Sequence, residues 1–174
     1  VVRVLGQVVH RALEGLTVLP VSQRSERRIA SAVQAAGVSL GLPRGDWGWA
    51  AQQVRAVLLN PALQPWLDPD QVLWAGNEVA VGHAGQVLRI DRLVAVTEPG
   101  ASPGQRSWWV IDYKLSEQPQ ALGAYRDQMA RYVAAVAQLQ PGEAVRGAFI
   151  TGSGEWVQAD DLPATPHGDP TGVK

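Results

Sequence analysis

The chain has 174 residues, 46% of them hydrophobic and 18% charged, and its formal net charge at pH 7 is −1. This length suits one globular domain, and no apolar run approaches the roughly 20 residues that a membrane-spanning helix needs, so no membrane anchor is expected. The absence of cysteine excludes disulfides, thiolate nucleophiles and cysteine-bound zinc or iron–sulfur clusters, and the near-zero charge is unlike that of an autonomous, tight binder of duplex DNA.

The start of the sequence bears on its context. The first residue is Val1 rather than methionine, and no basic segment followed by an apolar one marks a secretory signal. We therefore expect a fragment of a longer polypeptide in a cytoplasmic location, with which the lack of cysteine is compatible.

The first 66 residues or so carry helical patterns. Three helices are predicted, over residues 2–16, 22–37 and 46–59. Ser22 is the expected N-cap of the second helix and Gly37 its stop, while Pro61 closes the third. Together these helices form a predicted amino-terminal helical subdomain.

Two polar features of these helices are candidates for function. His10 lies at the border of the apolar face of the first helix, where a lone histidine is usually a capping or core residue. Arg24, Arg27 and Arg28 are expected on one flank of the second helix, as either a solvated face or a patch that tracks phosphates.

The pattern then changes to strands. Strands are predicted over residues 72–81, 86–96, 108–114, 145–151 and 155–158, with a hairpin turn at 82–85, a loop at 98–107 and a helix at 120–139. We expect one domain over residues 1–158, helical to about 66 and with its sheet core from about 72. Residues 159–174 are rich in proline and glycine and are expected to form a frayed tail.

The strand over residues 108–114 ends in charged residues. Its period-two alternation places Asp112 and Lys114 on one side of the strand and Ile111 and Tyr113 on the other. Lys114 is one of only two lysines, against thirteen arginines, which suggests that a compact ammonium is needed there. A solvated ion pair at a strand end remains the alternative interpretation.

A second carboxylate interrupts an apolar strand. Asp91 lies at the centre of the strand over residues 86–96, where an unpaired charge would be costly. Either a divalent cation shared with Asp112 or an arginine, Arg89 or Arg92, would compensate it.

Four segments in order resemble one nuclease family. They are residues 6–14 around His10, Ile90-Asp91-Arg92-Leu93, Val110-Ile111-Asp112-Tyr113-Lys114 and Tyr125-Arg126-Asp127-Gln128-Met129-Ala130-Arg131-Tyr132. Together they resemble the RecB-type nucleases of the PD-(D/E)XK superfamily, which include the carboxy-terminal nuclease domains of AddA-like and RecB-like helicases. The resemblance implies an α/β fold: a restriction-endonuclease-like mixed central sheet flanked by helices, with an added amino-terminal helical part.

The resemblance also implies a set of site residues. The implied metal ligands are His10, Asp91, Asp112, the Tyr113 backbone carbonyl and Glu78, and the implied catalytic residues are Asp91, Asp112, Lys114, Gln128 and Tyr132. Mg²⁺ or Mn²⁺ is the expected ion, with a histidine ligand shifting the preference slightly toward Mn²⁺. Glu78 belongs either to the metal cluster or to an exposed strand position.

The protein side chains around the metal have distinct expected roles. Lys114 orients the attacking water, helps to deprotonate it or offsets charge in the transition state, and the sequence does not choose among these. Tyr125, Gln128 and Tyr132 share one face of the helix over residues 120–139, a stripe that is normally core. The resemblance makes Gln128 and Tyr132 a site-adjacent pair that supports or contacts the substrate strand.

The function implied is that of a metal-dependent deoxyribonuclease of the exonuclease type. It would belong to a helicase-nuclease that processes DNA double-strand breaks for recombinational repair. The expected substrate is a single strand delivered by a helicase motor in the same polypeptide, and a second nuclease or helicase subunit is a further candidate partner. The alternatives are a nuclease-like module that binds DNA or a partner without cleavage, and an unrelated α/β domain whose carboxylates form ordinary ion pairs.

Overall fold

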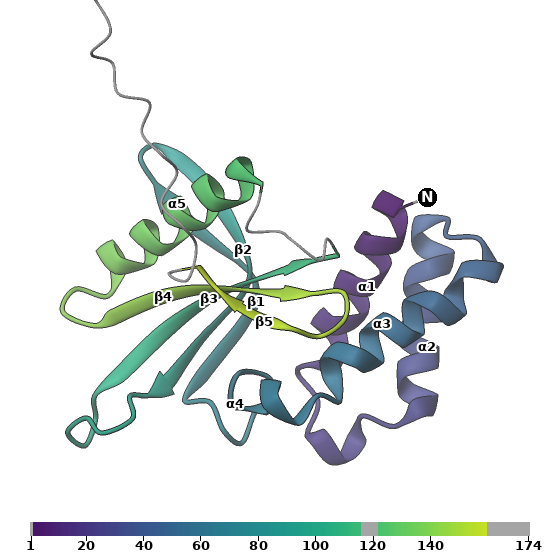
Figure 1. The fold of residues 1–174 in the computed structure, drawn as a ribbon, viewed down its shortest axis with the longest axis horizontal. Helices are drawn as coiled ribbons and strands as arrows, with labels where there is room; N and C mark the ends of the chain where they lie inside the picture. The colour runs from purple at the N-terminus through teal and green to yellow at the C-terminus, as the bar shows by residue number, and fades with distance from the viewer. Residues whose placement is uncertain (1, 116–121, 160–174) are drawn as a thin grey trace, which may run out of the picture.

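The structure, a computed structural model, describes residues 2–115 and 122–159 (Figure 1). The helices are α1 (Val2–Leu16), α2 (Glu26–Leu40), α3 (Trp47–Leu58), α4 (Gln64–Leu67) and α5 (Gly123–Leu139). The strands are β1 (Trp74–His83), β2 (Gln86–Thr97), β3 (Arg106–Lys114), β4 (Ala144–Thr151) and β5 (Trp156–Gln158). Most of the predicted tail, and the connection through Pro119 with the predicted start of the following helix, lie outside the described residues.

The five strands form one mixed sheet in the order β1-β2-β3-β4-β5. β3 and β4 are parallel, and every other neighbouring pair is antiparallel. α5 connects the two parallel strands, as such a crossover requires. The predicted hairpin between β1 and β2 turns through Ala84 and Gly85, both with positive φ (49° and 76°), the backbone of a tight two-residue hairpin turn.

Helices cover the sheet on both sides (Figure 1). One apolar core lies between the sheet and α1–α4, and a second lies between the sheet and α5. In β3 the alternation divides the strand between them, because Ile111 packs into the first core and Val110 into the second. The predicted α/β class, with its mixed sheet and amino-terminal helical part, is confirmed.

The second helix differs from its prediction at both ends. It begins at Glu26 because the Ser25 hydroxyl, rather than that of Ser22, caps it by accepting a hydrogen bond from the Arg28 N–H. It runs through Gly37 and ends at Gly41, whose φ is +76°. A Cβ on Gly37 would lie 2.6 Å from the Trp47 indole nitrogen, so this glycine serves close packing against α3 and not helix termination.

Arg24 is not part of a surface patch, which corrects the predicted arginine cluster. Its guanidinium is buried and donates hydrogen bonds to three backbone carbonyls, those of Thr17, Leu19 and Leu67. Burial lowers its pKa. Arg27 and Arg28 are exposed, so only two of the three residues are accessible to a phosphate.

Among residues 2–115 and 122–159, no helix combines the length and the apolarity that spanning a bilayer requires.

The turn between β4 and β5 ties the sheet to the helical part. The Asn60 side-chain amide donates a hydrogen bond to the Gly154 carbonyl at 2.9 Å. Gly154 has a φ of +83°, and a Cβ there would lie 2.3 Å from the Ala56 carbonyl oxygen at the end of α3.

We predict that Gly154→Ala lowers the free energy of unfolding by about 2 kcal/mol or more, because it combines an unfavourable φ with a backbone clash. Gly104→Ala is the matched control: its φ is +89°, but nothing lies within 4 Å of an added Cβ. That variant should lose only about 1 kcal/mol. Denaturant unfolding of both measures the difference, and equal losses would show that the turn does not dock tightly on α3.

Candidate metal centre

Three side chains from three different elements meet where α1 lies against the middle of β1 and β2. His10 from α1, Glu78 from β1 and Asp91 from β2 each offer a ligand atom, and these atoms lie within 4.8 Å of one another. His10 Nε2 is 2.9 Å from Glu78 Oε1 and 3.5 Å from Asp91 Oδ1. The three side chains are about one-fifth to one-quarter exposed, so the cluster is open to solvent on one side.

Glu78 reaches this cluster through an unusual backbone. Its φ is +50°, a left-handed conformation that costs a residue other than glycine on the order of 1–2 kcal/mol. The register of β1 and β2 pairs the residues on either side but is interrupted at Glu78 and Asp91. The strain lies where two carboxylates face each other across the ladder.

The alternation of β2 also changes at this point. Leu88 and Ile90 are two positions apart and both pack into the core under α5, as the period of two in a regular strand requires. Leu93 packs into the same core, three residues after Ile90, so the inward-facing residues shift by one position across Asp91. The side-chain alternation of β2 is therefore interrupted at Asp91, opposite the positive φ of Glu78.

Asp112 and Lys114 complete the site from β3. They lie on the same side of the strand, as their alternation predicts, with Lys114 Nζ 3.1 Å from Asp112 Oδ2. The Asp112 side chain is only 5% exposed. Burial, and then the hydrogen bond and negative charge of Asp91, raise the pKa of Asp112 to about 8, while Lys114 opposes the rise.

Tyr113 acts on the site through its main chain. Its N–H donates a hydrogen bond of 3.1 Å to Asp91 Oδ2, which fixes that carboxylate against β3. Its phenol packs against the core under the amino-terminal helices. The predicted role of its carbonyl oxygen as a metal ligand stays a prediction.

The arginines expected as alternatives for balancing Asp91 have other partners. Arg92 is buried, and its guanidinium donates to the Trp66 carbonyl and to the Asn77 side chain. The Arg89 Nε lies 3.9 Å from a Glu78 oxygen. Within residues 2–115 and 122–159, neither of these arginines forms an ion pair with Asp91.

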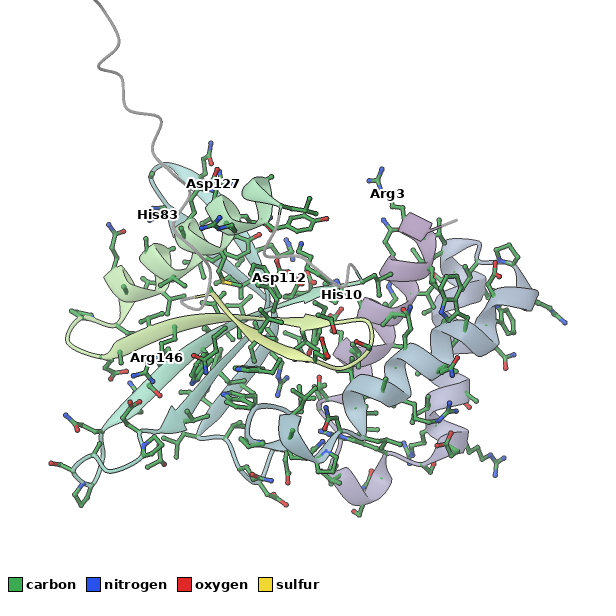
Figure 2. The ribbon with its side chains drawn as sticks, in the orientation of Figure 1. Arg3, His10, His83, Asp112, Asp127 and Arg146 are labelled. Atoms are coloured by element: carbon green, nitrogen blue, oxygen red, sulfur yellow. The ribbon has the colours of Figure 1, made fainter. Side chains whose placement is uncertain are left out.

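Most of the predicted site residues border one open pocket of about 790 Å³, whereas Glu78 does not line it. Its lining includes His10, Asp91, Asp112, Lys114, Gln128 and Tyr132. Figure 2 shows His10 and Asp112 side by side where α1 meets the sheet. The face of α5 that was predicted from spacing therefore borders the site. Burial, followed by the negative charges of Asp112 and Asp91, raises the pKa of Tyr132, so its hydroxyl stays protonated.

Six residues that line this pocket were not among the predicted site residues, and Tyr125 and Arg3 are the aromatic and the charged ones among them. Tyr125 places its ring 4.1 Å from Lys114 Nζ, and Arg3 lines the pocket from the first turn of α1. Both are on predicted faces: Tyr125 precedes Gln128 by one turn, and Arg3 precedes His10 by two. Helical spacing from the predicted residues could have found them.

The donor set suits a divalent cation. His10 Nε2 and Asp112 Oδ2 are buried without a hydrogen bond, although each lies within 3.1 Å of an oppositely charged or polar atom. Carboxylate oxygens together with an imidazole nitrogen are ligands that Mg²⁺ and Mn²⁺ accept. A positive ion would also relieve the close approach of Asp91 to Glu78 and of Asp112 to Asp91.

A sequence model of the PD-(D/E)XK nuclease superfamily matches residues 1–169. The chain belongs to this superfamily. Asp112-Tyr113-Lys114 has the form of the superfamily's (D/E)XK element, and the alternative of an unrelated α/β domain is therefore wrong. A search of curated proteins finds no match to the chain.

The raised pKa of Asp112 predicts how the metal-free PD-(D/E)XK domain responds to pH. An acid that binds its proton more tightly when folded stabilises the fold fully below its unfolded pKa, and that stabilisation is lost as pH rises toward the folded value. For Asp112 the window runs from 3.8 to about 8.

We therefore expect Asp112→Asn, which stays neutral, to gain in melting temperature relative to wild type as the pH is raised from 5 to 8 in a chelator. Thermal unfolding at matched ionic strength measures this difference. If the melting temperatures of the two proteins changed in parallel with pH, a raised pKa of Asp112 would be contradicted.

Proposed function

We propose that this domain is a metal-dependent deoxyribonuclease that hydrolyses phosphodiester bonds, with Mg²⁺ or Mn²⁺ as its cofactor. The observation that carries the proposal is the meeting of His10, Glu78 and Asp91 in a PD-(D/E)XK fold, beside a pocket that His10, Asp91, Asp112 and Lys114 line together. The ion would be held by His10, Asp91 and Asp112, with Glu78 and the Tyr113 carbonyl as further ligands.

A bound divalent cation supplies a Lewis acid that polarises the phosphate and lowers the pKa of a coordinated water. The protein supplies the geometry around it. Tyr113 N–H holds one oxygen of Asp91, which leaves the other oxygen toward His10. Asp112, whose pKa is raised to about 8 in the metal-free protein, is held ready to give up its proton when positive charge arrives.

Lys114 brings the only positive charge that contacts Asp112 within the described contacts. Its ammonium is a compact donor that can orient the attacking water or offset the charge that develops on the phosphate. Gln128 and Tyr132 border the same pocket from α5, where an amide and a protonated hydroxyl can hydrogen-bond to a nucleotide. We assign them to contact with the substrate strand.

The first test is Asp112→Asn, which removes the charge and preserves the shape. We expect DNA cleavage to fall at least about 100-fold, because even residues that only support metal ligands cost 10- to 100-fold when changed. Asp127→Asn on the exposed face of α5 is the matched control and should cleave as wild type (Figure 2). Cleavage with Mg²⁺ and metal affinity by calorimetry are measured on proteins that share a circular-dichroism spectrum.

A wild-type domain that binds DNA but does not cleave it with either metal would favour the alternative of a binding module. Full activity in Asp112→Asn would remove Asp112 from the metal centre.

We further propose that the domain acts as the exonuclease of a helicase-nuclease in double-strand break processing and recombinational repair, on single strands fed by a motor in the same polypeptide. The proposal rests on the RecB-type resemblance and on charge. The net charge is −1, Arg24 is buried, and Lys114 is paired with Asp112, so the chain has no net excess of positive charge to attract phosphates. A second nuclease or helicase subunit is a further proposed partner.

Tethering would raise the effective concentration of strand at the site without any new contact. We therefore expect the longer polypeptide with ATP to cleave end-labelled single-stranded DNA about 100-fold or more faster than residues 1–174 alone at equal metal and salt. The isolated domain should also lose binding steeply as salt is raised. Equal specific activity of the two proteins would show that the domain needs no motor.

A further inference from the structure

The Lys114 ammonium has two neighbours that differ in chemistry. On one side, Asp112 Oδ2 lies 3.1 Å from Nζ. On the other, the ring centroid of Tyr125 lies 4.1 Å from Nζ, well within the distance at which a cation is attracted to the face of an aromatic ring. The lysine side chain is 19% exposed, so both contacts are shielded from bulk water.

Only one of these two contacts is independent of the metal. Asp112 is a proposed ligand, and a divalent cation on its carboxylate would compete with Lys114 for the same negative charge. The cation would also repel the ammonium directly, because both are positive. The ring of Tyr125 carries no formal charge and binds no metal, so its attraction for the ammonium is unaffected by the ion.

The ring also comes from a different element than the lysine. Lys114 is the last residue of β3, and its four-carbon stem has many rotamers. Tyr125 lies in the first turn of α5 and packs against the core beneath that helix, which limits the movement of its ring. A flexible cation is thus held by a rigid partner.

We infer that Tyr125 is a positioning residue, whose ring face keeps the Lys114 ammonium directed over the metal centre once Asp112 has bound the ion. The inference rests on the proposed function. It assigns the role to the ring and not to the phenolic hydroxyl. The residues on this face of α5 would then have two different roles. Tyr125 acts through Lys114, whereas Gln128 and Tyr132 are assigned to direct contact with the DNA strand.

Kinetics of three variants test the role. Tyr125→Phe keeps the ring and should cleave DNA at the wild-type rate. Tyr125→Leu keeps an apolar side chain without a ring and should lower kcat about 3- to 30-fold, the range that a cation–π contact supplies, with KM for DNA and metal affinity unchanged. In a Lys114→Ala background, Tyr125→Leu should produce no further loss, because the two residues act as one unit.

The contact itself can be observed without any activity. The chain has only two lysines, Lys114 and Lys174, so their side-chain NMR signals are readily distinguished. The methylene protons of Lys114 beside the ring should be shifted upfield by the ring current in wild type and in Tyr125→Phe, with and without Mg²⁺. They should move to an ordinary lysine position in Tyr125→Leu.

Failure of this inference is separable from failure of the proposed function. If wild type shows no metal-dependent cleavage, the proposed function is rejected. If wild type cleaves but Tyr125→Leu is equally fast, or Tyr125→Phe is as slow as Tyr125→Leu, the ring has no positioning role. An upfield shift that disappears when Mg²⁺ is added would likewise overturn it, because the contact must persist in the loaded site.

Discussion

Repulsion between the buried Asp112 and its neighbour Asp91 is the constraint on which the rest of this site depends. Glu78 and Asp91 meet at His10, Asp112 interacts with Asp91, and the pKa of about 8 for Asp112 is the consequence of burial and of Asp91. Without an ion, the domain relieves the repulsion with the groups it has: His10, Lys114 and a backbone N–H. The fold thus tolerates an unfavourable arrangement at the position where an added cation has most to gain.

The backbone that produces this convergence is held by a polar clamp one residue away. Arg92 donates to Asn77, and the Asn77 side-chain amide donates in turn to the Glu14 carbonyl on α1. These partners are the chain neighbours of Asp91 and Glu78, and α1 is the helix that carries His10. The same hydrogen bonds therefore connect the interrupted stretch of β1 and β2 to the helix that carries His10. A strained φ can persist there because its surroundings determine it from both sides.

Sequence patterns predicted what depends on local periodicity and missed what depends on tertiary contact. The alternation in β3 placed Asp112 and Lys114 on one side correctly, because a period of two survives in any regular strand. The placement of His10 beside Asp91 needed a family resemblance, since the two residues are far apart in sequence. Arginine is usually exposed at the surface, and the burial of Arg24 is explained only by the three backbone carbonyls that accept its hydrogen bonds. Gly37 has the local signature of a helix stop, which the packing of Trp47 overrides.

The different geometries of the guanidinium and ammonium groups explain where this domain uses arginine and where it uses lysine. Arg24 and Arg92 are buried where several fixed acceptors must be met in set directions, and the forked guanidinium satisfies them in place. A guanidinium held by several hydrogen bonds would have to break them in order to bind a ligand. At position 114 the ammonium lies between a carboxylate and an aromatic face, neither of which demands a fixed donor direction. A lysine there can turn from Asp112 toward a phosphate or a water without breaking a rigid hydrogen-bond network, which is the property that a group acting during a reaction requires.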